Sequence, residues 1–250
     1  MKLPSPLLRG RLIRRYKRFL ADVALDTGEI VTAHCANPGS MMGLVEPGAV
    51  VWLAKSEDPR RKLAYSWHLL ELEGQFTARV GINTASPNQI AFEAIAAGLI
   101  PELGGYDTIR REVRYGRNSR VDLLLTGRQL PPCYVEVKNV HLSRQAGLAE
   151  FPDCVTARGA KHLAELADRV AEGDRAVMLF IVQPDYCDRF ALAADLDPAY
   201  ARQFGAAQAA GVECLIYACK IGLDEIVIDT RLPFADEIII SANAEAPAPG

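Results

Sequence analysis

The spacing of apolar and polar residues divides the chain into two parts. Residues 9–80 hold short, strand-length apolar stretches such as EIVTAHC and FTARV, separated by turn sequences such as ANPGS and EPGA. None of these stretches has a convincing helical period. The pattern predicts a small β-barrel or β-sandwich over residues 1–82, and the stretches that follow have a different character.

Helices are predicted from residue 83 onward. SPNQIAFEAIAAGLI (86–100) has the features of a helix, with Ser86 as N-cap, Pro87 at the first position and Gln89 completing a capping box. Further helices are predicted over 156–172 and after Asp197, with strands such as AVMLFIVQ between them. Interleaved strands and helices predict an α/β domain over 83–240 with helices on both faces of its sheet. The final residues, 241–250, are small and proline-rich, and we expect a flexible tail.

Composition and cysteine usage indicate the compartment. The 250 residues are 50% hydrophobic and 24% charged, which is ordinary globular usage. The basic start has no apolar signal region, and the longest apolar run, 176–182, is too short to cross a bilayer. Six cysteines show no metal-binding spacing, so we expect them to be reduced and mostly buried. We expect a cytoplasmic protein without a membrane partner, and association with the nucleoid stays open.

The net charge of -3 conceals a basic N-terminal segment. Residues 1–18 contain no acid, and their basic residues are Lys2, Arg9, Arg11, Arg14, Arg15, Lys17 and Arg18. A local basic stripe on a mildly acidic protein favours a polyanion such as nucleic acid as partner. The alternative is a solvated charged strand. We therefore predict DNA binding, largely independent of sequence, through Arg11, Arg14, Arg15, Lys17 and Arg18.

The segment YVEVKNV (134–140) places two opposite charges in an otherwise buried strand. If it pairs antiparallel with SRVDLLLT across GRQLPP, Val121 lies opposite Val137, Leu123 opposite Val135 and Leu125 opposite Cys133. The same register sets Arg120 opposite Lys138 and Asp122 opposite Glu136, with Cβ atoms about 5 Å apart. A slightly shifted register would leave the two acids as separate surface charges.

Two opposed carboxylates repel each other unless a proton or a cation lies between them. Two carboxylates with waters and a substrate phosphate suit Mg²⁺, or Mn²⁺ in its place. Lys138, on the same face, would orient a water or neutralise charge in the transition state. The pattern predicts metal-assisted phosphodiester hydrolysis with Asp122, Glu136 and Lys138 as catalytic residues and the two acids as metal ligands.

Asp122 followed by Glu136-Val137-Lys138 resembles the signature of the PD-(D/E)xK nuclease superfamily, although Val121 stands where the formula has proline. The segments HCANPGSM, RRYKRFLADV, RYGRNSRVDLLL, CYVEVKNVHL and FPDCVTARGAKHL together resemble the sugar fermentation stimulation protein A (SfsA) family over nearly the whole chain. The resemblance implies an N-terminal OB-like β-barrel, a PD-(D/E)xK nuclease-like α/β domain with a mixed central sheet, and DNA binding.

Other residues have weaker signals. Glu93 is a candidate extra acid near the metal, because related nucleases often place one on the preceding helix, and the alternative is a solvated glutamate. Arg158, Lys161 and His162 lie within about one helical turn, and we predict that they contact nucleic-acid phosphates. A binding role for His34, Asn37 and Ser40 rests on the resemblance, since Asn-Pro-Gly is also ordinary turn chemistry. Trp52 and Trp67 suit a buried core better than base stacking.

Three functions are compatible with the sequence: a Mg²⁺-dependent DNA nuclease, a DNA-binding regulator of sugar catabolism genes with a vestigial nuclease fold, and a sugar-binding protein. The retention of all three residues of the signature favours the nuclease. The basic stripe has no purpose in a sugar-binding protein.

Overall fold

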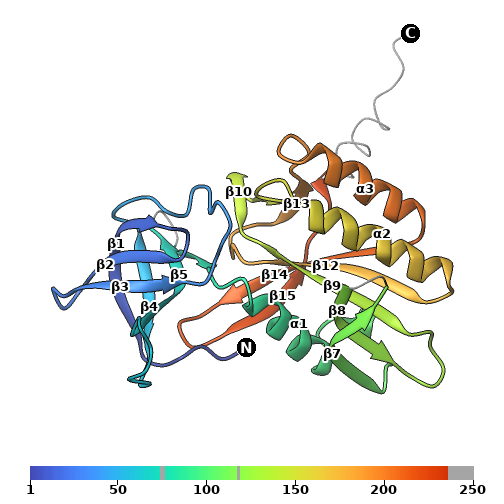
Figure 1. Cartoon of the computed structure of the whole chain (residues 1–250), viewed down its shortest axis with the longest axis horizontal. Coiled ribbons are helices and arrows are strands. Elements are labelled where there is room, and N and C mark those ends of the chain that lie inside the picture. The colour runs from blue at the N-terminus through green and yellow to red at the C-terminus, as the bar shows by residue number, and fades with distance from the viewer. Residues whose placement is uncertain (74–76, 117–118, 236–250) are drawn as a thin grey trace, which may run out of the picture.

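A β-barrel and an α/β domain lie side by side in the computed structural model, which describes residues 1–73, 77–116 and 119–235 (Figure 1). No described helix has the length and apolar character to cross a membrane. All six cysteines are described and none is in a disulfide; Cys35, Cys133, Cys187 and Cys219 are buried, as expected for reduced core residues.

The barrel is built from the short alternating stretches of the first part. Its strands are β1 (Leu7–Tyr16), β2 (Leu20–Leu25), β3 (Ile30–Cys35), β4 (Val50–Lys55), β5 (Tyr65–Leu72) and β6 (Ala78–Gly81). The order is β3-β2-β1-β4-β5-β6, and parallel pairing of β3 with β5 closes the sheet. Closure gives β3 a hydrogen-bonded neighbour on both sides, β2 and β5. The inward side chains, Trp67 among them, form one core. The barrel prediction is confirmed.

The second domain carries a mixed six-stranded sheet in the order β15-β14-β12-β9-β8-β7. Its elements are α1 (Ser86–Ala96), η1 (Pro101–Leu103), β7 (Thr108–Tyr115), β8 (Ser119–Thr126), β9 (Cys133–Val140), β10 (Leu142–Gln145), β11 (Leu148–Phe151), α2 (Ala157–Ala171), β12 (Arg175–Val182), β13 (Arg189–Leu192), α3 (Pro198–Ala209), β14 (Glu213–Ile221) and β15 (Ile226–Arg231). β12 runs parallel to β9 and β14, and the outer pairs are antiparallel.

Helices cover both faces of this sheet, as predicted (Figure 1). One face packs against α1 around Ile90, and the other packs against α2 and α3 around Leu163 and Phe204. Thr156 and Asp197 cap the last two helices through their side chains. The predicted capping box at Ser86 is wrong: Ala85 is the N-cap, and it has no side-chain cap bond.

Two features of the chain path differ from the predictions. A small sheet, β10-β11-β13, was not predicted, because strands of four residues are too short to show an alternating pattern. The assignment of residues 1–82 to the barrel needs a correction at its start. Leu3 is buried in the α1-side core and Lys2 bridges to Glu225. The predicted tail, 241–250, lies outside the described residues.

The barrel contacts the second domain through a polar junction at the loop after β3. Arg15 donates to the carbonyls of Asn37 and Gly39, at 2.8 and 3.0 Å. A Cβ on Gly39 would lie 2.6 Å from Oδ2 of Asp153, so any larger residue would displace this carboxylate. Oδ2 of Asp153 also lies 3.4 Å from Nε2 of the buried His141. The junction therefore joins the barrel loop to the residue that directly follows β9.

Burial raises the pKa of Asp153, but the neighbouring imidazole of His141 outweighs it and sets this pKa to about 2. Because this value lies below that of the unfolded chain, the carboxylate stabilises the fold above about pH 4 and loses this effect as the pH falls toward 2.

Asp153→Asn should lower the free energy of unfolding by about 2 kcal/mol at pH 7, and the deficit should shrink between pH 4 and pH 2, measured by denaturant titration. Asp195→Asn, at an exposed carboxylate paired with Arg144, is the control and should cost much less because solvent screens that pair. A deficit at Asp153 that does not change with pH would contradict this account.

Candidate functional site

The strands β8 and β9 place the predicted site at the centre of the second domain. Leu123 pairs with Val135 and Leu125 pairs with Cys133, so the predicted register is confirmed over these residues. Their side chains, all buried, belong to the core on the α1 side. The two acids lie one residue beyond this paired stretch, on neighbouring strands.

Asp122 marks the point where the two strands separate. The described ladder between β8 and β9 ends at Leu123, and Oδ2 of Asp122 accepts a hydrogen bond of 2.8 Å from the backbone N–H of Val137. Oδ1 accepts a second bond of 2.8 Å from Nδ2 of Asn88 on α1. The carboxylate thus replaces a backbone carbonyl as the partner of β9.

This separation corrects the remainder of the predicted register. The pairing of β8 with β9, both fully described, does not extend to Val121 with Val137, Arg120 with Lys138 or Asp122 with Glu136, so the prediction that these two acids are a directly opposed pair is wrong. Arg120 pairs instead with Arg114 of β7, and Val121 packs into a separate small cluster. The apolar face is therefore interrupted at the level of the acids.

Glu136 is buried, with 3% of its surface exposed, and points toward α2. Its Oε1 accepts a hydrogen bond of 2.8 Å from Nζ of Lys138 and also contacts Nδ1 of His162. Its Oε2 is buried without a hydrogen-bond partner in the described structure. A buried carboxylate oxygen in this state has a vacant acceptor position, which a cation can fill.

The two carboxylates influence each other electrostatically. Burial, followed by the negative charge of Glu136, raises the pKa of Asp122 from 3.8 to about 6. Burial also acts to raise the pKa of Glu136, but His162 and Lys138 outweigh it and the net shift is downward. Glu136 is therefore the ionised partner, and Asp122 is ionised at a cost near neutral pH.

The pair fits a divalent cation that retains several water molecules. The described residues contain no group of three or more His, Cys, Asp or Glu placed to hold a metal. Mg²⁺ is commonly held by one or two carboxylates, with water and substrate phosphate completing its octahedral shell. Asp122 and the vacant Oε2 of Glu136 meet that requirement.

Glu93 does not join the pair in this arrangement. Its carboxylate lies 2.8 Å from the N-terminal amine of Met1 and accepts a bond from Gln89. α1 presents Asn88 to Asp122 instead, a residue that the sequence analysis did not select. No recognisable motif marks Asn88; its position near the start of α1 is the available signal.

The residues predicted on α2 do reach the site. Nε of Arg158 donates to Nε2 of His162 at 3.3 Å, so Nε2 is an acceptor and the ring proton belongs on Nδ1, where it faces Glu136. His162 thus orients Glu136, and a phosphate contact by this histidine stays a prediction. Lys161 lies 3.6 Å from Glu165. A cavity of about 390 Å³ adjoins these side chains.

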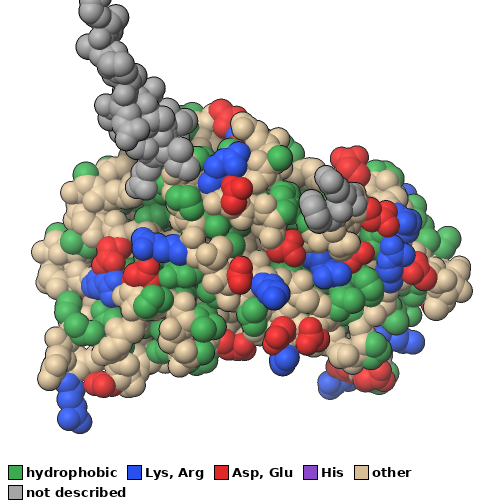
Figure 2. Space-filling model, turned by 180° about the vertical axis from the view of Figure 1, so that it is seen from behind, with side chains coloured by type: hydrophobic (Ala, Val, Ile, Leu, Met, Phe, Trp, Pro, Cys, Tyr) green, Lys and Arg blue, Asp and Glu red, His purple; other side chains and the backbone are tan. Residues whose placement is uncertain are grey.

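The basic stripe on the barrel is partly neutralised by its own neighbours. Arg11 pairs with Glu73 at 2.9 Å, Arg14 pairs with Asp22 at 2.8 Å, and Arg15 is bound to backbone carbonyls. Lys17 and Arg18, at the turn after β1, have no carboxylate partner among the described residues. Figure 2 shows acidic and basic side chains interspersed on the face opposite to that of Figure 1.

The remaining candidates have structural contacts. Asn37 is buried. Its Nδ2 donates to the carbonyl of Ile82, which follows β6, and its Oδ1 accepts from the N–H of Gly39 in the junction loop. Ser40 lies 3.3 Å from Asp153. His34 stacks on Phe19. Trp67 is fully buried as predicted, and Trp52 is partly buried with its indole N–H on Glu71.

The chain matches known proteins over most of its length. Residues 13–79 match the SfsA N-terminal OB domain, and residues 85–225 match the sugar fermentation stimulation protein RE domain. A sugar fermentation stimulation protein homolog from Rhodospirillum centenum is 57% identical over 93% of this chain and 98% of its own. A second, from Maricaulis maris, is 56% identical over 91% and 96%.

A solved structure has the same architecture. It is that of Pyrococcus furiosus SfsA in complex with Ca²⁺, which is 29% identical to this chain and superposes with a TM-score of 0.81 over 94% of this chain and 97% of that one. Together with the barrel, the mixed sheet and the two domain matches, these likenesses show that the chain belongs to the sugar fermentation stimulation protein (SfsA) family.

Proposed function

We propose that this protein is a nuclease that hydrolyses phosphodiester bonds in DNA with the help of a divalent cation. The observation that carries the proposal is the pair of carboxylates formed by the partly buried Asp122 and the buried Glu136, in which Glu136 retains an unpartnered oxygen beside Lys138. A site without a cation has no evident use for two neighbouring acids of which one, Glu136, raises the pKa of the other, Asp122. The Ca²⁺ bound by the Pyrococcus relative supports a divalent ion in this family.

The chain's own residues have distinct tasks in this proposal. Asp122 and Glu136 would hold the cation, which when bound stabilises negative charge developing on the phosphoryl oxygens. Asn88 and the N–H of Val137 fix the carboxylate of Asp122, and His162 fixes that of Glu136. Lys138 places a positive charge beside Glu136, where it would stabilise the transition state more than the bound substrate.

The competing function is a DNA-binding regulator that holds a cation but performs no chemistry. The small number of metal ligands among the described residues is compatible with it. Both functions require nucleic-acid phosphate at the same site, so the two are separated by rates of cleavage rather than by binding.

The first test addresses the carboxylate pair. Because the pKa of Asp122 in the fold, about 6, lies above its unfolded value of 3.8, the protein should lose stability as the pH rises from about 4 to above 6. Asp122→Asn removes up to about 3 kcal/mol of this cost. With chelator at pH 8, its melting temperature should exceed that of the wild type, and added Mg²⁺, Mn²⁺ or Ca²⁺ should no longer raise it.

The matched control is Asp185→Asn. Burial also raises the pKa of Asp185, whose carboxylate accepts from the backbone N–H of Arg79, so this substitution relieves a cost of the same sign elsewhere. The control should keep the melting shift that divalent ions produce. An Asp122→Asn protein with the wild-type response to cations would contradict the assignment of this residue as a ligand.

The second test concerns Lys138 and separates the nuclease from the regulator. We expect the wild type to nick or cut DNA with Mg²⁺ or Mn²⁺. Lys138→Met should bind DNA nearly normally in chelator while the cleavage rate falls by roughly 10²-fold or more, the scale for losing one preorganised electrostatic group. Linear, nicked, single-stranded and branched DNA are the substrates to compare.

Lys220→Met provides the control for Lys138→Met, because Lys220 is an exposed lysine on β14 of the same sheet. It should cleave at the wild-type rate. No cleavage of any DNA form by the wild type would leave the regulator as the function. Equal rates for Lys138→Met and the wild type would place the activity at another site or in a contaminant.

A further inference from the structure

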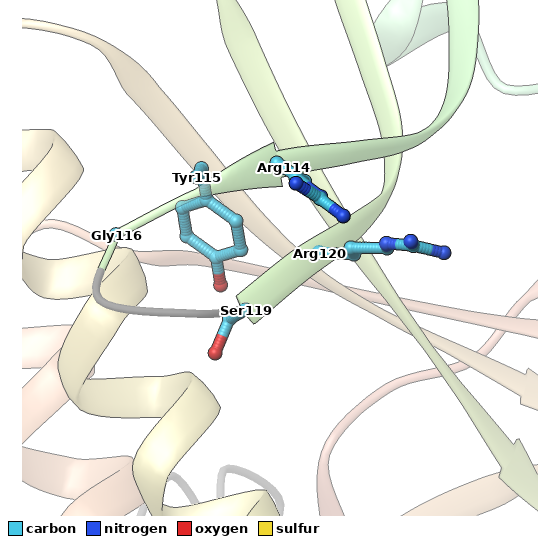
Figure 3. A pocket seen from close by; sticks show the side chains of 5 residues that line it. All are labelled: Arg114, Tyr115, Gly116, Ser119 and Arg120. Atoms are coloured by element: carbon cyan, nitrogen blue, oxygen red, sulfur yellow. The ribbon is translucent and has the colours of Figure 1, made fainter.

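Two arginines face each other across the hairpin of β7 and β8. Arg114 pairs directly with Arg120, and the next pair along is Tyr115 with Ser119. Figure 3 shows the two guanidinium groups next to each other on one side of the hairpin, with the hydroxyl groups of Tyr115 and Ser119 on the other. Both side chains are exposed, and like charges directly opposite each other destabilise a sheet, so a bound anion would offset the repulsion between them.

The described protein does not supply that anion. Arg114 and Arg120 have no hydrogen bond or ion pair to another described side chain, whereas most other arginines of the chain do. Carboxylate partners are present for Arg9, Arg11, Arg14, Arg60, Arg79, Arg144, Arg169, Arg175, Arg189 and Arg231. The hairpin pair differs from the other unpartnered arginines, such as Arg128 and Arg202, because its two members lie directly opposite each other on paired strands.

The hairpin arginines line two adjoining cavities. The first, of about 490 Å³, is lined by Arg114, Tyr115, Gly116, Ser119 and Arg120. The second, of about 390 Å³, shares Ser119 and Arg120 with it and adds Glu112, Arg158, Lys161 and His162. Glu112 is the one carboxylate among these lining residues, against four cations. Guanidinium groups bind phosphate in a bidentate manner, which makes a phosphate the matching ligand.

The position of this cluster relative to the carboxylate pair defines which phosphate it binds. Arg120 precedes Asp122 by two residues on β8, so their Cα atoms are about 6.6 Å apart. The second cavity also touches His162, whose Nδ1 contacts Glu136. The cations thus lie next to the site of the proposed reaction.

We propose that Arg114 and Arg120, together with Arg158 and Lys161, form a subsite for a phosphate that does not react and that neighbours the attacked phosphate on the same strand. The inference rests on the proposed function, because it concerns the strand that this nuclease would cut. The subsite holds the substrate strand in register with the carboxylate pair, and it is separate from the basic stripe on the barrel.

The test compares charge loss at this hairpin with equal charge loss elsewhere. Binding of a fluorescein-labelled duplex oligonucleotide is measured by anisotropy in chelator over a series of salt concentrations. Arg114→Ala/Arg120→Ala should weaken binding by at least about 10-fold, and the slope of log affinity against log salt should become shallower by about one to two, since each lost phosphate contact removes about 0.9. The free variant should be at least as heat-stable as the wild type, because the repulsion is gone.

Two further variants serve as controls for the alanine pair. Arg128→Ala/Arg202→Ala removes two exposed arginines that have no side-chain partner among the described residues, and it should bind like the wild type. Arg114→Lys/Arg120→Lys keeps the charges and should keep most of the salt slope. The proposal is overturned if the alanine pair retains the affinity and slope of the wild type, or if the lysine pair loses the slope to the same extent as the alanine pair.

These outcomes are independent of the proposed chemistry, because binding is measured without a cation. A wild type that binds through the hairpin but never cleaves DNA would remove the nuclease and leave the subsite. A wild type that cleaves DNA, with unchanged binding by the alanine pair, would remove the subsite and leave the nuclease.

Discussion

Two neighbouring carboxylates, the partly buried Asp122 and the buried Glu136, lie where β8 separates from β9 and are the constraint on which the rest of the site depends. The pKa of Asp122 is raised by burial and by Glu136, which means that ionising both acids is costly. The neighbouring groups offset that cost from two directions. Asn88 and the N–H of Val137 donate to Asp122, and Lys138 and His162 stabilise Glu136 as an anion. None of these contacts involves Oε2 of Glu136, which has no hydrogen-bond partner in the described structure.

Helices on both faces of the sheet make this arrangement possible. α1 brings Asn88 to one acid and α2 brings His162 to the other, while the cores on the two faces hold the helices at fixed positions. β9 then leads to His141 and, through Asp153, to the barrel loop at Gly39. β9 therefore carries Glu136 and Lys138 and, through His141, the attachment of the barrel loop, so the position of the barrel is linked to that of the acids.

The alternating apolar residues of β8 and β9 were sufficient to predict the register, because a slip by one residue would expose Leu123 and Leu125. The separation at Asp122 was not predictable, since a side chain there replaces a backbone partner and no periodicity encodes that exchange. The rotation of α1 about its axis decides that Asn88, rather than Glu93, meets Asp122. Packing sets this rotation, and the sequence of the helix alone does not.

The basic stripe illustrates a second limit of sequence reasoning. Counting charges over residues 1–18 identified a cationic segment, but antiparallel pairing brings Asp22 to Arg14, and the chain returns with Glu73 beside Arg11. The hairpin arginines gave no such signal in sequence, because they are separated by the turn and meet only when β7 pairs with β8.

This redistribution of charge bears on how a protein with a net charge of -3 could bind a polyanion. At physiological ionic strength, charges are screened over about 8 Å, so the net charge matters less than the cations within contact distance of a phosphate. An arginine already paired with a carboxylate contributes little, because binding a phosphate first requires breaking that pair. On this basis the unpaired arginines next to the carboxylate pair outweigh most of the barrel stripe, and the α/β domain is expected to supply affinity as well as chemistry.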